Sequence, residues 1–140
     1  MEPARLTLPA AAESIAPFRE FVRAGALEAG IVPEELEKLD LILEEILINV
    51  ARYAYTPEKG LVDVGYLADS AGKLRVEVVD SGRVFNPLEV DPPDLSRGLQ
   101  ERPIGGLGVF LVRAMVASID YRRDGNRNIL SFTFPSDSLS

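Results

Sequence analysis

The sequence contains neither cysteine nor histidine, and these two absences exclude much of the common chemistry of protein sites. Without cysteine the chain can form neither a disulfide framework nor a thiolate metal site. Without histidine it cannot build the usual zinc sites, a Ser-His-Asp triad or imidazole acid–base catalysis. Any proton transfer must therefore fall to a carboxylate, a lysine, a tyrosine or water.

Long apolar runs and excess positive charge are also missing. No apolar segment approaches the roughly 20 residues that a membrane helix needs, and the first five residues do not begin a secretion signal. The formal net charge of −7 argues against a nucleic-acid backbone as the main partner. We therefore expect a cytoplasmic protein with no direct nucleic-acid partner and no membrane partner.

The length and the pattern of apolar residues indicate one α+β domain over residues 1–140. Helical spacing predicts helices over residues 11–30 and 33–55, and alternation predicts strands at 6–8, 61–68, 74–79, 119–122 and 129–134. Residues 85–106 show no period and predict a functional loop, with another helix from residue 107. Because strands and helices are grouped rather than alternating, we expect a two-layer sandwich of a mixed β-sheet and α-helices.

The first candidate motif lies in the second long helix. Glu45 and Asn49 are four residues apart, so their side chains share one helix face. Asparagine is a mediocre helix former, and Asn49 stands among Leu, Ile and Val. Its amide oxygen is a ligand that Mg²⁺ accepts. An exposed polar face explains such a pair equally well, and for Glu44 we adopt that interpretation.

Two further motifs follow. Asp80 ends a strand, where its carboxylate can accept a hydrogen bond from an exocyclic amine such as that of adenine, and Gly82 lets the backbone pass close to a flat ring. Gly105, Gly106 and Gly108 precede a helix, so free backbone N–H groups there can face an anion. Taken singly, an ordinary turn and a flexible hinge explain these motifs as well.

The order of the three motifs is more specific than any one of them. An E-x-x-x-N helix, then D-x-G-x-x-F after a strand, then G-G-x-G before a helix, resembles the N, G1 and G2 boxes of the gyrase–chaperone–histidine-kinase–mismatch-repair (GHKL) ATPase superfamily. The segments LEEILINVARYAY (43–55), FNP (85–87) and GLGVFLV (106–112) are similar to its anti-sigma-factor serine/threonine kinase branch. The resemblance covers residues 36–134.

This resemblance implies a role for each matching residue. Asn49 would hold the Mg²⁺ that bridges the phosphates of ATP, and Glu45 would activate the attacking hydroxyl. Asp80 would read the adenine amine, with Gly82 and Phe85 shaping the base pocket. The phosphates would meet the N–H groups of the three glycines, under a lid at residues 92–104. Two arginines in that lid could neutralise phosphate charge, and simple solvation explains each of them equally well: Arg97 and Arg102.

The resemblance also implies partners. The acceptor would be a serine or threonine on a STAS-domain anti-anti-sigma protein, the other partner a sigma factor, and the protein itself a homodimer. Many relatives carry histidine where this chain has Tyr53, a substitution that removes a possible polar contact near the phosphates. The partner-contacting surface on the first helix cannot be matched residue by residue, so the final partner stays open.

Two other functions fit the same residues. The protein could be a non-catalytic, nucleotide-dependent binding module that sequesters a signalling partner, for which Asn49 is needed more than Glu45. It could also be a detached histidine-kinase catalytic domain, whose phosphohistidine product would be lost in acid whereas phosphoserine survives.

Overall fold

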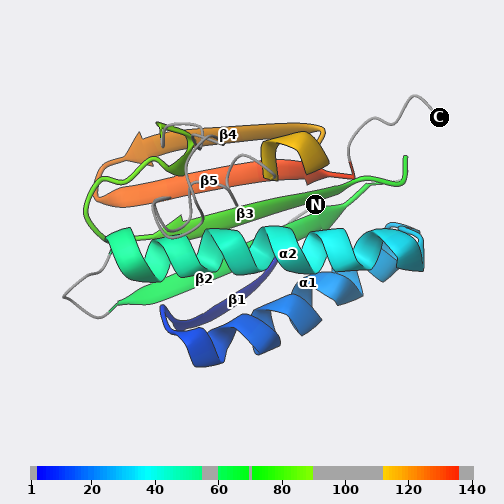
Figure 1. Ribbon diagram of the computed structural model, residues 1–140, viewed down its shortest axis with the longest axis horizontal. Helices are drawn as coiled ribbons and strands as arrows, with labels where there is room; N and C mark the ends of the chain where they lie inside the picture. The colour runs from blue at the N-terminus through cyan, green and yellow to red at the C-terminus, as the bar shows by residue number, and fades with distance from the viewer. Residues whose placement is uncertain (1–2, 55–59, 70, 90–111, 136–140) are drawn as a thin grey trace, which may run out of the picture.

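The computed structural model describes residues 3–54, 60–69, 71–89 and 112–135, without the side chains of Tyr53 and Glu89. Within these ranges a helical layer lies on one face of a β-sheet (Figure 1). The helices are α1 (Ile15–Glu28) and α2 (Pro33–Asn49), with short helical turns η1 (Ala12–Ser14), η2 (Val50–Ala54) and η3 (Pro87–Glu89). The strands are β1 (Ala4–Pro9), β2 (Leu61–Ala68), β3 (Leu74–Asp80), β4 (Ser118–Asp124) and β5 (Arg127–Phe134).

The five strands form one sheet in the order β1-β2-β3-β5-β4. The predicted α+β sandwich is confirmed, but every pair of neighbouring strands among the described residues is antiparallel, so the expected mixed sheet is wrong in this respect. Short turns join β2 to β3 and β4 to β5, and such hairpins must be antiparallel. Strand β5 lies antiparallel beside β3.

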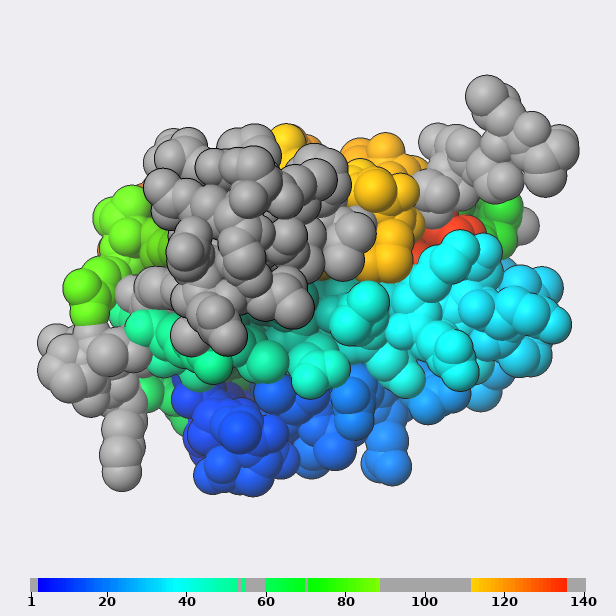
Figure 2. All heavy atoms as spheres, viewed as in Figure 1, coloured from blue at the N-terminus to red at the C-terminus, as the bar shows by residue number. Residues whose placement is uncertain are grey.

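Alternation along the strands explains the core. Every second residue of the central strands faces the helices and is buried: Val62, Val64, Tyr66, Leu74, Val76, Val78, Leu130, Phe132 and Phe134. The apolar stripes of α1 and α2 close over them, with Phe18 and Val22 from one helix and Leu39 and Leu43 from the other. Figure 2 shows the two helices, blue and cyan, lying side by side across this face.

The predicted elements agree with the structure to within a few residues, with two differences. The first predicted helix opens with a 3-10 turn at Ala12–Ser14, and α2 gives way to a π-helical turn after Asn49. The helix predicted from residue 107 falls largely outside the described residues; residues 112–115 are helical. No helix in the described ranges has both the length and the apolar character needed to cross a membrane.

Two leucines on α2 test this packing, because Leu39 is fully buried and Leu41 is 49% exposed. We expect Leu39→Ala to lower the free energy of unfolding by about 2–5 kcal/mol, through lost burial and the cavity left behind. Leu41→Ala, with the same change of helix propensity, should cost less than about 1 kcal/mol. Urea unfolding of both variants measures the difference, and equal losses would contradict the assigned core.

Candidate functional site

Polar side chains are rare in the interior, and three of them lie near the carboxyl-terminal end of α2 and the adjoining end of the sheet. The buried polar side chains in the described ranges are those of Ser14, Asn49, Asp80, Asn128 and Ser131. Asn49 is the last residue of α2, Asp80 the last of β3, and Asn128 lies opposite Asp80 on β5. Burying unpaired polar groups is costly, so such a grouping needs a structural or functional reason.

Asp80 and Asn128 line a small pocket between α2 and the sheet. Its walls are mainly apolar and come from the end of α2, from β3, β4 and β5, and from the segment after β3: Ile46, Val50, Val78, Phe85, Pro87, Tyr121 and Leu130. The pocket measures only about 10 Å³, so a flat ring could enter only if its walls moved apart; its carboxylate and amide suit a ring that carries a hydrogen-bond donor. The adenine base of ATP is such a ring, so the chemistry of the lining residues, though not the present volume of the pocket, matches the nucleotide that the sequence predicts.

The carboxylate of Asp80 is held from two sides. Its Oδ1 accepts hydrogen bonds from the backbone N–H of Gly82, at 2.9 Å, and from Nδ2 of Asn128, also at 2.9 Å. Burial raises the pKa of Asp80, and these two hydrogen bonds together with the charge of Arg123 partly oppose the rise. The protein thus keeps a desolvated carboxylate at the end of a strand, where a ligand can use it.

Gly82 is required by a close approach of two backbone segments. A Cβ atom at this position would lie 2.8 Å from Cβ of Ala54, the last residue of the π-helical turn, and closer still to the carbonyl of Ala54. That carbonyl accepts a hydrogen bond from the N–H of Arg83 at 2.9 Å. The segment after Asp80 is therefore packed directly on the end of the helix that carries Glu45 and Asn49.

Glu45 and Asn49 meet as the helical spacing predicts. Nδ2 of Asn49 donates a hydrogen bond to Oε1 of Glu45 at 3.3 Å. Burial raises the pKa of Glu45 and the charge of Glu44 adds to the rise, whereas the hydrogen bond from Asn49 and the charge of Arg52 oppose it. Because the Asn49 nitrogen is used in this bond, its oxygen is the atom left for a cation. Glu44 pairs with Arg19 at 3.8 Å, in keeping with a surface role.

The described residues offer no cluster of three or more acidic, histidine or cysteine side chains that could hold a metal ion. A magnesium ion at this place would therefore depend on phosphate oxygens and water for most of its ligands. That is how Mg²⁺ is commonly bound in nucleotide sites, with one or two protein oxygens. A single amide oxygen from Asn49 fits this mode.

Several predicted site residues lie outside the described part of the chain. These are Arg97, Arg102, Gly105, Gly106 and Gly108, together with the side chain of Tyr53. Phe85, in contrast, is described and lines the pocket. The structure thus brings Asp80 and Phe85 together, packs Gly82 against the end of the helix bearing Asn49, and joins Asn49 to Glu45.

Asn128 is the residue of this site that the motifs do not include. A signal for it exists in the sequence, because Asn128 is in phase with Leu130, Phe132 and Phe134, all of which face the helices. A polar residue on the buried face of a strand needs hydrogen-bond partners. Among the predicted motifs, the strand end at Asp80 offered such a partner for Asn128.

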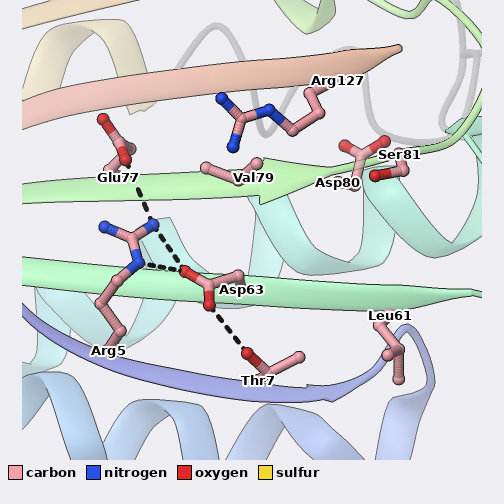
Figure 3. Close-up of a pocket in the computed structure, with 9 residues that line it drawn as sticks. All are labelled: Arg5, Thr7, Leu61, Asp63, Glu77, Val79, Asp80, Ser81 and Arg127. Atoms are coloured by element: carbon pink, nitrogen blue, oxygen red, sulfur yellow. Dashed lines mark hydrogen bonds and ion pairs between the residues drawn. The ribbon is translucent and has the colours of Figure 1, made fainter.

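A larger cavity, of about 390 Å³, opens on the opposite face of the sheet. Figure 3 shows Arg5 reaching Asp63 and Glu77 there, with Thr7 bonded to the same aspartate, while Asp80 and Ser81 stand at one edge. Its charged groups are largely neutralised by one another across neighbouring strands. Such exposed pairs stabilise a sheet modestly, and we assign the cavity no ligand.

The fold and these residues define a class of protein. Residues 8–134 match the family of the histidine kinase-like ATPase domain, and the chain belongs to that family. The recognition of a GHKL-type ATPase domain from its three motifs is thereby confirmed.

Within the family, the chain is similar to serine-protein kinases. It is 25% identical over 135 residues to the serine-protein kinase RsbW of Bacillus mycoides (strain KBAB4) and 27% identical to that of Bacillus cereus (strain AH187). Each alignment covers 92% of this chain and 82% of the relative. These relatives support a kinase of the RsbW type at the level of the family.

Solved structures show the same fold. The RsbU and RsbW domains of Rv1364c from Mycobacterium tuberculosis superpose with a TM-score of 0.61 at 17% identity, over 100% of this chain and 35% of that one. A blue-light activated histidine kinase of Erythrobacter litoralis, EL346, gives a TM-score of 0.54 at 24% identity, over 73% of this chain and 30% of that one.

The raised pKa of Asp80 gives a prediction with a defined sign. A carboxyl group with a raised folded-state pKa contributes stability below its ordinary pKa of 3.8, and loses this contribution as pH rises through the folded-state value. At neutral pH the ionised group therefore opposes folding. Asp80→Asn keeps an oxygen for both donors, so we expect a melting temperature equal to or a few degrees above wild type at pH 7.5, with the gain shrinking toward pH 4.

The same variant should bind ATP more weakly, by roughly 10- to 150-fold, because an amide N–H would then face the base amine. Calorimetric titration and thermal unfolding measure the two effects. Asp120→Asn, an exposed change on the outer face of the sheet, is the matched control and should alter neither. Wild-type affinity in Asp80→Asn would rule out Asp80 as the reader of the base.

Proposed function

We propose that this protein binds ATP with Mg²⁺ and transfers the terminal phosphoryl group to a serine or threonine of a STAS-domain protein. The observation that carries the proposal is the buried carboxylate of Asp80 in an apolar pocket, next to the helix end that bears the Glu45–Asn49 pair. The similarity to RsbW serine-protein kinases supports the reaction class. The proposal treats residues 1–140 as one domain.

The base would lie in the apolar pocket. Asp80 would accept a hydrogen bond from its exocyclic amine, and Phe85 would form part of the wall. Gly82 keeps the segment after Asp80 pressed against Ala54, which fixes the distance between this segment and the end of α2. The base would thus be bound by groups that take no part in the chemistry, and they would serve affinity and orientation.

The phosphates would extend toward the carboxyl-terminal end of α2. Asn49 would supply the protein ligand to the metal ion, and the N–H groups of Gly105, Gly106 and Gly108 would bind the phosphates, with Arg102 neutralising charge. Bound MgATP supplies the phosphoryl group and the metal that screens its charge. Phosphoryl transfer asks the protein mainly for positioning and electrostatic stabilisation, so few side chains suffice.

Glu45 would act as the general base toward the acceptor hydroxyl. It is half-buried, lies one helical turn before Asn49, and is oriented by the hydrogen bond from that amide. Burial raises its pKa, which makes the carboxylate a stronger base than one in water. The absence of histidine is compatible with this assignment, because the acceptor is a hydroxyl and the base a carboxylate.

A sigma factor as second partner and a homodimeric assembly complete the proposal. Both rest on the resemblance to the anti-sigma-factor kinase branch, and neither depends on a particular contact described above. The alternative function is a nucleotide-dependent binding module that holds its partner without phosphorylating it.

Two adjacent glutamates allow a matched test of the kinase. With MgATP and a STAS-domain substrate, we expect Glu45→Gln to lower the transfer rate by about 100-fold or more, the usual contribution of a general base, while ATP affinity changes little. Glu44→Gln removes a half-exposed charge one residue away and should change the rate by less than about threefold. Intact-mass measurement of the acid-stable product follows the reaction.

Different failures of this test have different meanings. Equal rates for Glu45→Gln and wild type would exclude Glu45 as the base. Mg-dependent ATP binding and a stable complex with the STAS protein, without transfer, would establish the binding module instead. An acid-labile product would indicate histidine as the acceptor.

The pH profile gives a separate prediction. Glu45 acts as a base only when ionised, so kcat/KM for transfer should fall as pH decreases through its pKa in the free protein. Because burial raises that pKa, the fall should begin at a higher pH than the ordinary value of 4.5 implies. A steady-state profile between pH 4.5 and 8 measures it, and the acidic limb should persist in Glu44→Gln. A profile that is flat to pH 4.5 would contradict a raised pKa for the base.

A further inference from the structure

We infer that Tyr121 and Arg123, on the edge strand β4, are positioning residues of the nucleotide pocket that act through Asn128. They would fix which oxygen of Asp80 meets the base, and so determine discrimination between adenine and a base without the amine. The inference rests on the proposed binding of ATP, and it does not depend on phosphoryl transfer.

The amide of Asn128 has its hydrogen-bonding capacity filled. Its Nδ2 donates to Oδ1 of Asp80 at 2.9 Å and to the carbonyl of Arg83 at 2.8 Å. Its Oδ1 accepts from the hydroxyl of Tyr121 at 2.6 Å, from Nη1 of Arg123 at 3.2 Å and from the backbone N–H of Phe85 at 3.2 Å. Asn128 therefore joins β3, β4, β5 and the segment after β3.

These contacts allow only one orientation of the amide. If the side chain were rotated by 180°, its NH₂ group would face three donors and its oxygen would face a carboxylate and a carbonyl. Two of the three donors that enforce the observed orientation come from the side chains of Tyr121 and Arg123. Tyr121 and Arg123, on the neighbouring strand β4, thus ensure that the nitrogen of Asn128, not its oxygen, faces Asp80.

Arg123 also holds the segment after β3 directly. Its Nη1 donates to the carbonyl of Gly82 at 2.9 Å, and its Nε donates to the carbonyl of Gly125 in the turn between β4 and β5. The guanidinium is therefore fixed at both ends while it contacts Asn128. A planar group with several donors in fixed directions suits this task, whereas a lysine could not reproduce it.

The register of the sheet explains why these two residues of β4 reach the pocket. Arg123 pairs with Asn128 and Tyr121 with Leu130, so both side chains lie on the face that carries the helices. Arg122, between them, lies on the opposite face and is exposed. The chain thus contains a control arginine on the same strand, one residue away.

The consequence for Asp80 concerns its two oxygens. Among the described residues, both hydrogen bonds to this carboxylate reach Oδ1. With Oδ1 saturated, Oδ2 would receive the amine of adenine. Inosine triphosphate carries a carbonyl in place of that amine, so a fixed Oδ2 would repel it. A carboxylate released from Asn128 could turn, and the repulsion would fall.

The test compares the dissociation constants of MgATP and Mg-inosine triphosphate by calorimetry for wild type, Arg123→Met, Tyr121→Phe and the control Arg122→Met. We expect Arg123→Met to weaken ATP binding on the order of tenfold or more, and Tyr121→Phe by about fivefold, through loss of the hydrogen bond to Asn128. In both variants the preference for ATP over inosine triphosphate should shrink. Arg122→Met should stay within about twofold of wild type for both nucleotides.

A merely structural role predicts a different pattern. It would lower the melting temperature and weaken both nucleotides in equal proportion, and that result would overturn the inference. So would equal behaviour of Arg123→Met and Arg122→Met. If Arg123→Met does not fold, the single-atom change Tyr121→Phe tests the inference by the same quantity, the ratio of the dissociation constants for inosine triphosphate and ATP.

The failure of the inference is distinguishable from the failure of the proposed function. A wild-type protein that binds neither nucleotide would overturn both. Tight binding of ATP with an unchanged preference in the variants would overturn the positioning role alone. The variants could lose their preference for ATP over inosine triphosphate although the wild-type protein transfers no phosphoryl group. That result would support the positioning role and exclude the kinase activity.

Discussion

The burial of one carboxylate, Asp80, is the constraint on which the rest of the site depends. An ionised group in an apolar setting is unfavourable, and it persists only where hydrogen bonds and a nearby positive charge compensate for lost water. The N–H of Gly82, the amide of Asn128 and the charge of Arg123 provide this compensation. To reach Asp80, these groups must hold the segment after β3 and the adjoining ends of β4 and β5 in fixed positions. The burial of one carboxylate therefore determines the arrangement of this end of the sheet.

The same constraint joins the two halves of the candidate site. The segment that donates to Asp80 packs against Ala54, the last residue of the turn that follows α2, and Gly82 has no room for a side chain there. Short π-helical turns occur often at functional sites, and this one follows directly after Asn49. The segment after Asp80 and the end of the helix that bears Glu45 and Asn49 are thereby fixed relative to each other by backbone contacts.

The sequence predicted what local periodicity and motif spacing control. Pro33 and the leucine stripe give α2, and the four-residue spacing gives the Glu45–Asn49 contact. It did not predict the antiparallel pairing of β3 with β5, because pairing between strands far apart in the sequence depends on contacts that local periodicity does not contain. Asn128 was missed for the same reason: its importance comes from lying opposite Asp80, 48 residues away. The roles of Arg102 and the three glycines fall outside the described residues and stay predictions.

The most direct test of the account is the position of the base in a crystal structure of the protein with Mg²⁺ and ADP. The account predicts the adenine ring between Val50 and the sheet, with its exocyclic amine about 3 Å from a carboxylate oxygen of Asp80. A base bound elsewhere, for example in the cavity beside Arg5 and Asp63 on the outer face, would contradict it.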